Sequence, residues 1–365
     1  MPSAISSPTI AAQPLADALN PQPSTARGEP LLKVRNLSKH FPIMSKGLIS
    51  RQVGIVRAVE QASFDLYPGE TLGLVGESGS GKTTCARTIL RALKPTSGTA
   101  HFRLNEPVGS SKTNVVDLAN VPENELKVLR PHMQMIFQDP YSSLNPRMTV
   151  ADIIAEPLLI HGMGNAGERR DKVVAILRKV GLKPEHMNRY PHAFSGGQRQ
   201  RIGIARALIM RPSLVVADEA VSALDVSVQA QVINLLMDLQ QEFRLTYIFV
   251  AHNLSVVRHI CNRVAVMYAG KIVELAETEE LFRNPRHPYT QGLMSAEPNI
   301  DPDIPMNFGL TGEVADTGNL PSGCSFHPRC PKRFEPCDKL TPQLQTVPGT
   351  QVQASCHLLC PPAGN

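Results

Sequence analysis

Residues 76–83 read Gly76-Glu77-Ser78-Gly79-Ser80-Gly81-Lys82-Thr83, and this motif is the strongest indication of the fold class. The spacing G-x-x-x-x-G-K-[ST] is that of a phosphate-binding loop between a strand and a helix. An apolar run over residues 72–75 predicts the strand, and residues 84–93, opened by Thr84, predict the helix. We expect the loop amides to surround nucleotide phosphates, Lys82 to bridge the β- and γ-phosphates, and the Thr83 hydroxyl to bind Mg²⁺.

A second buried strand, predicted over residues 214–217, ends in two acidic residues. Ligands of open α/β sheets bind at the carboxyl ends of the strands, so these acids belong to the same site. Asp218 is predicted to hold Mg²⁺ through water, because magnesium keeps several of its waters. Glu219 is predicted to be the general base that polarises the attacking water.

A second glycine-rich turn, Ser195-Gly196-Gly197-Gln198, precedes an apolar helical pattern over residues 202–208. The serine supplies a hydroxyl, and the two glycines let backbone N–H groups approach an anion closely. The following helix would direct its positive N-terminal end toward the same point. The sequence therefore predicts two separate phosphate-binding surfaces in one chain.

Taken in order, these motifs resemble those of the ATP-binding subunits of ABC transporters, over about residues 31–290. The resemblance assigns Gln138 to the glutamine that contacts Mg²⁺ and the attacking water. It assigns Asp225 to the D-loop and His252 to the switch histidine that touches the γ-phosphate. Phe41 falls where the family places an aromatic ring that stacks on adenine.

The resemblance implies an α/β fold of the ABC-type P-loop ATPases and a head-to-tail dimer. A RecA-like core is expected over residues 31–138 and 213–283, with an inserted helical subdomain over residues 139–212. In the dimer, each ATP is held by the phosphate-binding loop of one chain and by residues 195–198 of the other. Ala220 replaces the usual proline and Asn253 the commoner aspartate, but neither change removes a reacting group, so we expect hydrolysis.

Composition restricts where the protein acts. Residues 1–30 are rich in Pro, Ala and Ser, which predicts a disordered tail and no secretory signal. No apolar run approaches the ~18 residues of a membrane-spanning helix. We therefore expect a peripheral protein on the cytoplasmic face of the inner membrane. The net charge of +5 is spread out, and the Arg199–Arg206 cluster lacks interleaved aromatics, so we expect no nucleic-acid partner.

Beyond residue 284 the sequence becomes proline-rich and weakly periodic, so residues 284–365 form a separate C-terminal extension. Because no large core is evident there, something else should order it. Four cysteines give the spacing C-x5-C-x6-C-x18-C: Cys324, Cys330, Cys337 and Cys356. A cytoplasmic cysteine cluster more often marks a metal than disulfides. The residues alone leave a [4Fe-4S] cluster, zinc and free thiols open, with His357 and Cys360 as further candidate ligands.

The motif Gly323-Cys-Ser-Phe-His-Pro-Arg-Cys-Pro331 resembles the oligopeptide and dipeptide importer branch of the family, as do residues 140–146 and 287–290. In that branch the four matching cysteines hold a [4Fe-4S] cluster. The resemblance therefore implies such a cluster here, with a structural or regulatory role.

These observations predict an ATPase subunit that energises dipeptide or oligopeptide import. Its expected partners are a second ATPase subunit, a paralogue in this branch, two membrane permeases and, indirectly, a substrate-binding protein. The alternatives are a soluble ABC-type switch outside transport, or an importer of nickel complexes or glutathione. A single phosphate-binding loop and the lack of sustained heptads disfavour the soluble switch.

Overall fold

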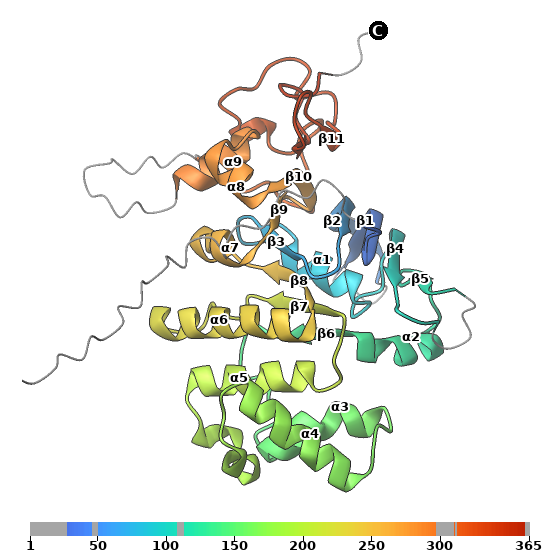
Figure 1. Ribbon diagram of the computed structural model, residues 1–365. Helices are drawn as coiled ribbons and strands as arrows, with labels where there is room; N and C mark the ends of the chain where they lie inside the picture. The colour runs from blue at the N-terminus through green and yellow to red at the C-terminus, as the bar shows by residue number, and fades with distance from the viewer. Residues whose placement is uncertain (1–27, 46–49, 108–112, 297–309, 311, 362–365) are drawn as a thin grey trace, which may run out of the picture.

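The computed structural model describes residues 28–45, 50–107, 113–296, 310 and 312–361 (Figure 1). The disordered tail predicted over residues 1–30 lies outside the described residues up to residue 27. Within the described ranges, no helix is long and apolar enough to cross a membrane.

An eight-stranded sheet forms the centre of the described chain (Figure 1). Its central strands β9, β3, β8, β7 and β6 run parallel, whereas β10, β12 and β11 join antiparallel at one edge. Every residue of β3, β7 and β8 is buried, as expected for parallel strands that are covered on both faces. In spatial order the strands are β11 (Gln345–Thr346), β12 (Gln353–Ala354), β10 (Lys271–Glu277), β9 (Arg263–Tyr268), β3 (Thr71–Val75), β8 (Thr246–Val250), β7 (Leu214–Asp218) and β6 (Met133–Ile136).

A second, antiparallel sheet packs over one face of the first. Its order is β2 (Gln52–Leu66), β1 (Leu32–Met44), β4 (Ser97–Arg103) and β5 (Val115–Asp117). Apolar side chains from β1, β2 and β4 share one hydrophobic cluster with α1 (Lys82–Ile89) and with β3. The helix that follows the phosphate-binding loop is thereby fixed between two sheets.

A block of helices lies between β6 and β7 in the sequence, although these two strands are neighbours in the sheet. The block and the C-terminal residues occupy opposite ends of the molecule (Figure 1). It consists of α3 (Val150–Ile160), α4 (Ala166–Lys179), the 3₁₀ turns Pro184–Asn188 and Pro191–Ala193, and α5 (Gly196–Leu208). The remaining helices are α2 (Glu123–Leu129), α6 (Val226–Phe243), α7 (Leu254–Ile260), α8 (Thr278–Arg283) and α9 (Pro288–Ser295), with 3₁₀ turns at Arg130–His132 and His327–Arg329.

The helix after the phosphate-binding loop is shorter than its sequence predicts. The pattern indicated residues 84–93, whereas α1 begins at Lys82 and ends at Ile89. Arg91 adopts a left-handed φ of 55°, which is incompatible with a continuing helix. Its buried guanidinium donates to the carbonyl oxygens of Leu118 and Val121, at 2.8 and 3.0 Å. This distant tertiary contact accounts for the early end.

The C-terminal residues are ordered differently from the expectation. Strands β11 and β12 extend the central sheet through β10. Phe326, Val347, Val352 and Ala354 are buried in the larger hydrophobic cluster of the molecule. The segment has few apolar side chains, and these pack into the core of the ATPase itself, which orders the segment without a large core of its own.

Candidate functional site

The phosphate-binding loop connects β3 to α1, and its glycines are dictated by close backbone approaches. Gly76 has φ 145°, and a Cβ there would lie 2.2 Å from the carbonyl oxygen of Met267. Gly81 has φ 102°, and its Cβ would lie 2.2 Å from the carbonyl oxygen of Ala58. Neither distance is compatible with a side chain, so the loop keeps its shape only with glycine at both positions.

Lys82 is folded into this loop. Its Nζ donates to the carbonyl oxygens of Gly76 and Glu77, both at 2.9 Å. Burial lowers the pKa of Lys82, while the nearby carboxylates of Glu219, Asp218 and Glu77 act in the opposite direction. The ammonium group is therefore held by two carbonyl oxygens of the loop, where phosphate oxygens could take their place.

Thr83 and Asp218 meet directly, although 135 residues separate them. The Thr83 hydroxyl donates to Asp218 Oδ1 at 2.7 Å, and Arg87 Nη2 lies 3.4 Å from Asp218 Oδ2. Burial raises the pKa of Asp218, and the contacts with Thr83 and Arg87 oppose that rise. Hydroxyl and carboxylate oxygens are the hard ligands that Mg²⁺ prefers, so this pair fits a magnesium site.

The three predicted catalytic residues converge on one carboxylate. Gln138 Nε2 donates to Glu219 Oε2 at 2.7 Å, and His252 Nδ1 lies 3.6 Å from the same oxygen. Glu219 follows β7 with φ 47°, a conformation that non-glycine residues seldom adopt. Its carbonyl oxygen is held by the Ser222 hydroxyl and amide, at 3.0 and 3.1 Å. The backbone therefore imposes the direction in which this carboxylate points.

The other loop residues occupy the surroundings of Lys82. Ser80 is fully buried and its amide donates to the Glu77 carbonyl oxygen at 3.2 Å. Ser78 and Gly79 are exposed, and Gly79 has φ 78°. Thr84 is partly buried, and its carbonyl oxygen accepts from the Thr88 hydroxyl. All eight residues of the predicted motif thus lie in one loop and the first turn of α1.

The second glycine-rich turn begins α5 in the helical block. Ser195 is its N-cap: the Ser195 hydroxyl accepts from the Gln198 amide at 3.4 Å, and Gln198 Oε1 accepts from the Ser195 amide at 3.1 Å. A Cβ on Gly197 would lie 2.4 Å from Val228 Cγ1 of α6, whereas Gly196 faces Leu224 at 3.6 Å. Among the hydrogen bonds and ion pairs of the described residues, none joins residues 195–198 to residues 76–84.

Two further predicted residues lie apart from this convergence. Asp225 is exposed at the start of α6 and makes no capping hydrogen bond with its side chain. Phe41 is partly buried in β1, opposite Val56 of β2, and Lys39 Nζ lies 4.8 Å from its ring centroid.

The four predicted cluster cysteines line a common pocket, together with His357. All seven cysteines are free thiols. Among the described residues, however, no group of three or more His, Cys, Asp or Glu side chains is arranged to hold a metal ion. Burial raises the pKa of Cys324 to about 11 and also raises the pKa of Cys330 and Cys356. The predicted [4Fe-4S] site therefore gains no support from this geometry.

The two remaining candidate ligands differ in position. His357 Nε2 lies 2.9 Å from the carbonyl oxygen of Leu340, so one ring nitrogen is already engaged. Cys360 Sγ lies 3.9 Å from the carbonyl oxygens of Gln345 and Thr346, and Cys360 does not line the pocket of the other four cysteines.

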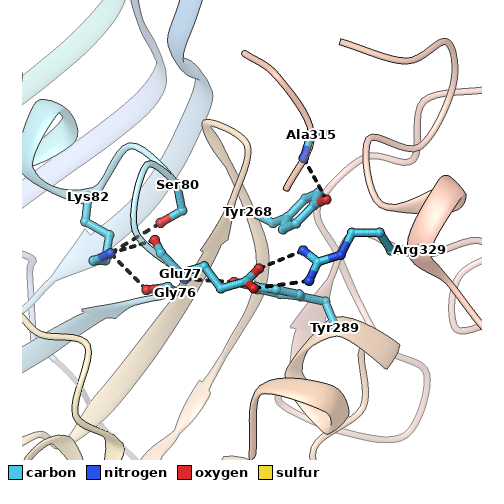
Figure 2. Close-up of polar contacts among 8 residues, drawn as sticks. All are labelled: Gly76, Glu77, Ser80, Lys82, Tyr268, Tyr289, Ala315 and Arg329. Atoms are coloured by element: carbon cyan, nitrogen blue, oxygen red, sulfur yellow. Dashed lines mark hydrogen bonds and ion pairs between the residues drawn. The ribbon is translucent and has the colours of Figure 1, made fainter. Parts of the chain in front are cut away.

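Sequence reasoning missed two residues that contact the phosphate-binding loop. Tyr289 Oη accepts the Glu77 amide at 2.9 Å, and Arg329 binds the Glu77 carboxylate (Figure 2). Both lie in motifs, residues 287–290 and 323–331, that pointed only to the importer branch of the family. Nothing in their local pattern points to a residue more than 200 positions away.

Comparisons with known proteins agree with this geometry. Residues 59–222 match the ABC transporter family, and residues 273–337 match the C-terminal region of oligopeptide/dipeptide transporters. The chain is 49% identical to the oligopeptide transport ATP-binding protein AppF of Bacillus subtilis, over 92% of this chain and 99% of that protein. It is 47% identical to the di/tripeptide transport ATP-binding protein DppF of Pseudomonas aeruginosa, over 90% and 98%.

Among solved structures, the dimeric ATP-binding cassette MJ0796, bound to ADP and Pi after hydrolysis, is 27% identical with a TM-score of 0.56. It covers 68% of this chain and 98% of its own. The α/β fold is therefore that of an ABC ATPase. The chain belongs to the ABC transporter family, among the ATP-binding subunits of its oligopeptide/dipeptide branch.

Proposed function

We propose that this protein hydrolyses ATP to energise the import of dipeptides or oligopeptides through a membrane ABC transporter. The observation that carries the proposal is the 49% identity to an oligopeptide transport subunit over nearly the whole chain, including the C-terminal region. A soluble ABC switch would not require that region. Relatives described as oligopeptide and di/tripeptide transporters favour peptides over nickel complexes or glutathione.

The phosphate-binding loop is proposed to bind ATP. Loop amides from Gly76 to Thr84 would surround the phosphates, and Lys82 would move from the loop carbonyls to the β- and γ-phosphate oxygens. Thr83, Asp218 and Gln138 would hold Mg²⁺, which offsets phosphate charge when bound. The adenine ring is proposed to stack on Phe41, on the antiparallel sheet beside the loop.

Hydrolysis is proposed to depend on Glu219. Its carboxylate accepts a proton from water as the water oxygen attacks the γ-phosphorus, and the bond to the β-phosphate oxygen breaks to release ADP and phosphate. Gln138 orients the water from one side, since it already contacts the reacting carboxylate oxygen. His252, which lies 3.6 Å from that oxygen, is proposed to donate to the γ-phosphate.

The second phosphate surface is proposed to serve another subunit. Residues 195–198 make no polar contact with this chain's own loop, and Ser195 is exposed at the N-terminus of α5. The second subunit is proposed to be a paralogue that binds head to tail. Its motif equivalent to residues 195–198 would contact the ATP bound by this chain, and Asp225 would lie at the interface between the two subunits. The solved structure of MJ0796, which is dimeric, supports a pair of ATPase subunits.

The rest of the proposed assembly lies at the membrane. Two permeases would contact the ATPase pair at the cytoplasmic face of the inner membrane, and a substrate-binding protein would act from the other side. Within the chain, we propose a RecA-like core over residues 31–138 and 213–283, a helical subdomain over 139–212 and an extension over 284–365. The insertion of α3 to α5 between adjacent strands β6 and β7 supports these boundaries.

The cysteine segment is proposed to bind a [4Fe-4S] cluster through Cys324, Cys330, Cys337 and Cys356. The proposal rests on the resemblance of residues 323–331 to the importer branch; the four cysteines line one pocket, and their thiols would have to ionise and reorient to hold the cluster. Anaerobically purified protein should then contain about four iron and four sulfide per chain. Cys324→Ser should remove the brown colour, and Cys85→Ser, a buried cysteine on α1, should not. One tightly bound zinc would exclude the cluster, and metal-free protein would exclude both metals.

The function is tested with the ATPase pair, permeases and binding protein reconstituted in vesicles. Labelled dipeptides and oligopeptides should accumulate only with ATP, and Lys82→Ala should abolish uptake. Lys183→Ala, an exposed lysine of the helical block, is the control. ATP-driven uptake of nickel complexes or glutathione without peptide uptake would overturn the substrate assignment.

A further inference from the structure

The C-terminal segment, residues 312–361, reaches the phosphate-binding loop through one arginine. Arg329 Nη1 and Nη2 donate to the two carboxylate oxygens of Glu77, at 2.8 and 3.1 Å (Figure 2). The Arg329 side chain is 6% exposed and that of Glu77 is 26% exposed. A two-pronged, largely buried pair of this kind fixes orientation as well as distance, which an exposed pair does not.

Glu77 is held at every polar group it has. Its amide donates to Tyr289 Oη at 2.9 Å. Its carbonyl oxygen accepts from Lys82 Nζ at 2.9 Å and from the Ser80 amide at 3.2 Å. With the carboxylate bound by Arg329, movement of this one residue would disturb both the lysine and the backbone amides that face the phosphates.

The arginine is itself fixed by an aromatic cluster. Its guanidinium lies 5.8 Å from the ring centroid of Tyr268, whose hydroxyl accepts from the Ala315 amide at 3.2 Å. Tyr268 packs against Tyr289 and Phe326, with ring centroids 4.7 and 5.2 Å apart. Tyr268 ends β9, Tyr289 belongs to α9 and Phe326 to the C-terminal segment. Three parts of the chain therefore position one guanidinium.

The charge of Glu77 supplies the chemical reason for such a contact. A carboxylate in the phosphate-binding loop repels ATP, and the loop would also lose its shape if Glu77 turned toward water. Arg329 offsets the charge from the side away from Lys82 (Figure 2). The pair therefore bears on both the electrostatics and the geometry of phosphate binding.

We propose that Arg329 is a positioning residue of the nucleotide site, through which the C-terminal segment sets the affinity of the phosphate-binding loop for ATP. This inference rests on the proposed assignment of residues 76–83 to the phosphates of ATP. In this role Arg329 acts on the nucleotide site through Glu77 and is not a catalytic residue. Because Cys324 and Cys330 flank the turn that carries Arg329, a displacement of residues 324–330 reaches the ATP site by this route.

The test measures ATP affinity of the full-length chain with a fluorescent ATP analogue and Mg²⁺, and KM and kcat of the assembled transporter. Arg329→Met should raise Kd and KM about tenfold and change kcat less than about twofold, because Glu219, Gln138 and His252 are untouched. Arg329→Lys keeps the positive charge but loses the two parallel hydrogen bonds of the guanidinium. Its Kd should therefore lie between those of the unaltered chain and of Arg329→Met. Arg333→Met, an exposed arginine of the same segment, is the matched control and should bind ATP as the unaltered chain does.

A double-mutant cycle separates positioning from a general effect on folding. In the Glu77→Gln background, Arg329→Met should change Kd less than about twofold, since the pair is already broken. Additive effects, or an unchanged Kd with a lower unfolding temperature, would overturn the proposal. If Arg329→Met does not fold, the cycle is run with Arg329→Lys under the same criteria. Lys82→Ala separates the proposed function from this inference. If Lys82→Ala binds ATP with unaltered affinity, the assigned ATP site is refuted. If Lys82→Ala weakens ATP binding but Arg329→Met leaves Kd unaltered, this inference alone is refuted.

Discussion

The phosphate-binding loop and the C-terminal segment touch at the Glu77–Arg329 pair, but the chain builds them by different means. The nucleotide site depends on the backbone. Its glycines stand where other backbone atoms approach too closely for a side chain, and its acidic residues lie at the end of the fully buried parallel strand β7. The segment depends on side chains: Phe326, Val347 and Val352 inserted into a core that belongs to other elements. Substitutions at the nucleotide site should therefore alter chemistry before stability, and substitutions of the buried apolar side chains of the segment should alter stability before chemistry.

The largest effect is expected in the segment. Phe326→Ala removes a ring that is 1% exposed and contacts Tyr268, Tyr289 and His287. It should lower the free energy of unfolding by about 3–5 kcal/mol, the usual cost of emptying a buried phenylalanine site. Chemical denaturation of the full chain measures this. Phe334→Ala, whose ring is 44% exposed, is the control and should cost far less. Equal losses in the two variants would mean that the segment is not anchored by its apolar side chains.

Glu219→Gln tests the expectation that substitutions at the nucleotide site alter chemistry before stability. Hydrolysis by the assembled transporter should fall about 10²-fold or more, because the amide cannot accept the proton of water. ATP affinity and the unfolding free energy should change little, since the phosphate cradle is intact. Glu185→Gln, an exposed glutamate of the helical block, should hydrolyse ATP normally. Turnover at the unaltered rate in Glu219→Gln would show that another group activates water.

Ser195→Arg tests whether the two predicted phosphate-binding surfaces act independently in one chain. ATP binding to the isolated subunit should be retained, because residues 195–198 make no polar contact with the loop. Turnover of the assembled pair should fall about tenfold or more, since a bulky cation occupies the place proposed for the partner's γ-phosphate. Arg189→Ala, an exposed position upstream on the same block, is the control. Loss of ATP affinity in the isolated subunit would contradict the division between surfaces.

The smallest effect concerns pH and the anchoring of the C-terminal region. Burial lowers the pKa of His287 to about 4, and its Nδ1 accepts the Tyr289 amide at 3.0 Å. The unfolded chain binds a proton near pH 6.5 and the folded chain does not, so stability is lost as pH falls from 6.5 toward 4. The His287 contribution between pH 7 and 6 is about 0.7 kcal/mol.

His287→Asn isolates this contribution. Asparagine keeps a capping acceptor for α9 but does not titrate, so the variant should lose less stability than the unaltered chain over the same pH range. Burial raises the pKa of Glu274, which accepts the His287 amide at 2.9 Å and contributes stability in the opposite direction as pH falls. That contribution is common to both chains and cancels in the difference. Identical pH profiles would exclude His287 as the titrating group.

The sequence alone was enough to identify the family and the nucleotide loop, and to predict that Gln138, Glu219 and His252 belong to one site. The loop could be predicted because it is a contiguous octapeptide whose glycines are required by the local backbone geometry. Asp218 ends and Glu219 follows a strand whose burial is visible in four consecutive apolar residues, 214–217. The meeting of Gln138, Glu219 and His252 at one oxygen follows from parallel strands that end at one edge of a sheet.

The way in which the two regions are joined could not be predicted from the sequence and became visible in the folded chain. The early end of α1 at Ile89 depends on the Arg91 contacts with Leu118 and Val121, and the C-terminal strands depend on a free edge of β10. The pairing of Arg329 with Glu77 spans 252 residues, and neither residue carries a local pattern that selects the other. Such contacts arise from the relative placement of packed elements, which periodicity and motif spacing do not encode, because those signals report only on a residue's near neighbours in the chain.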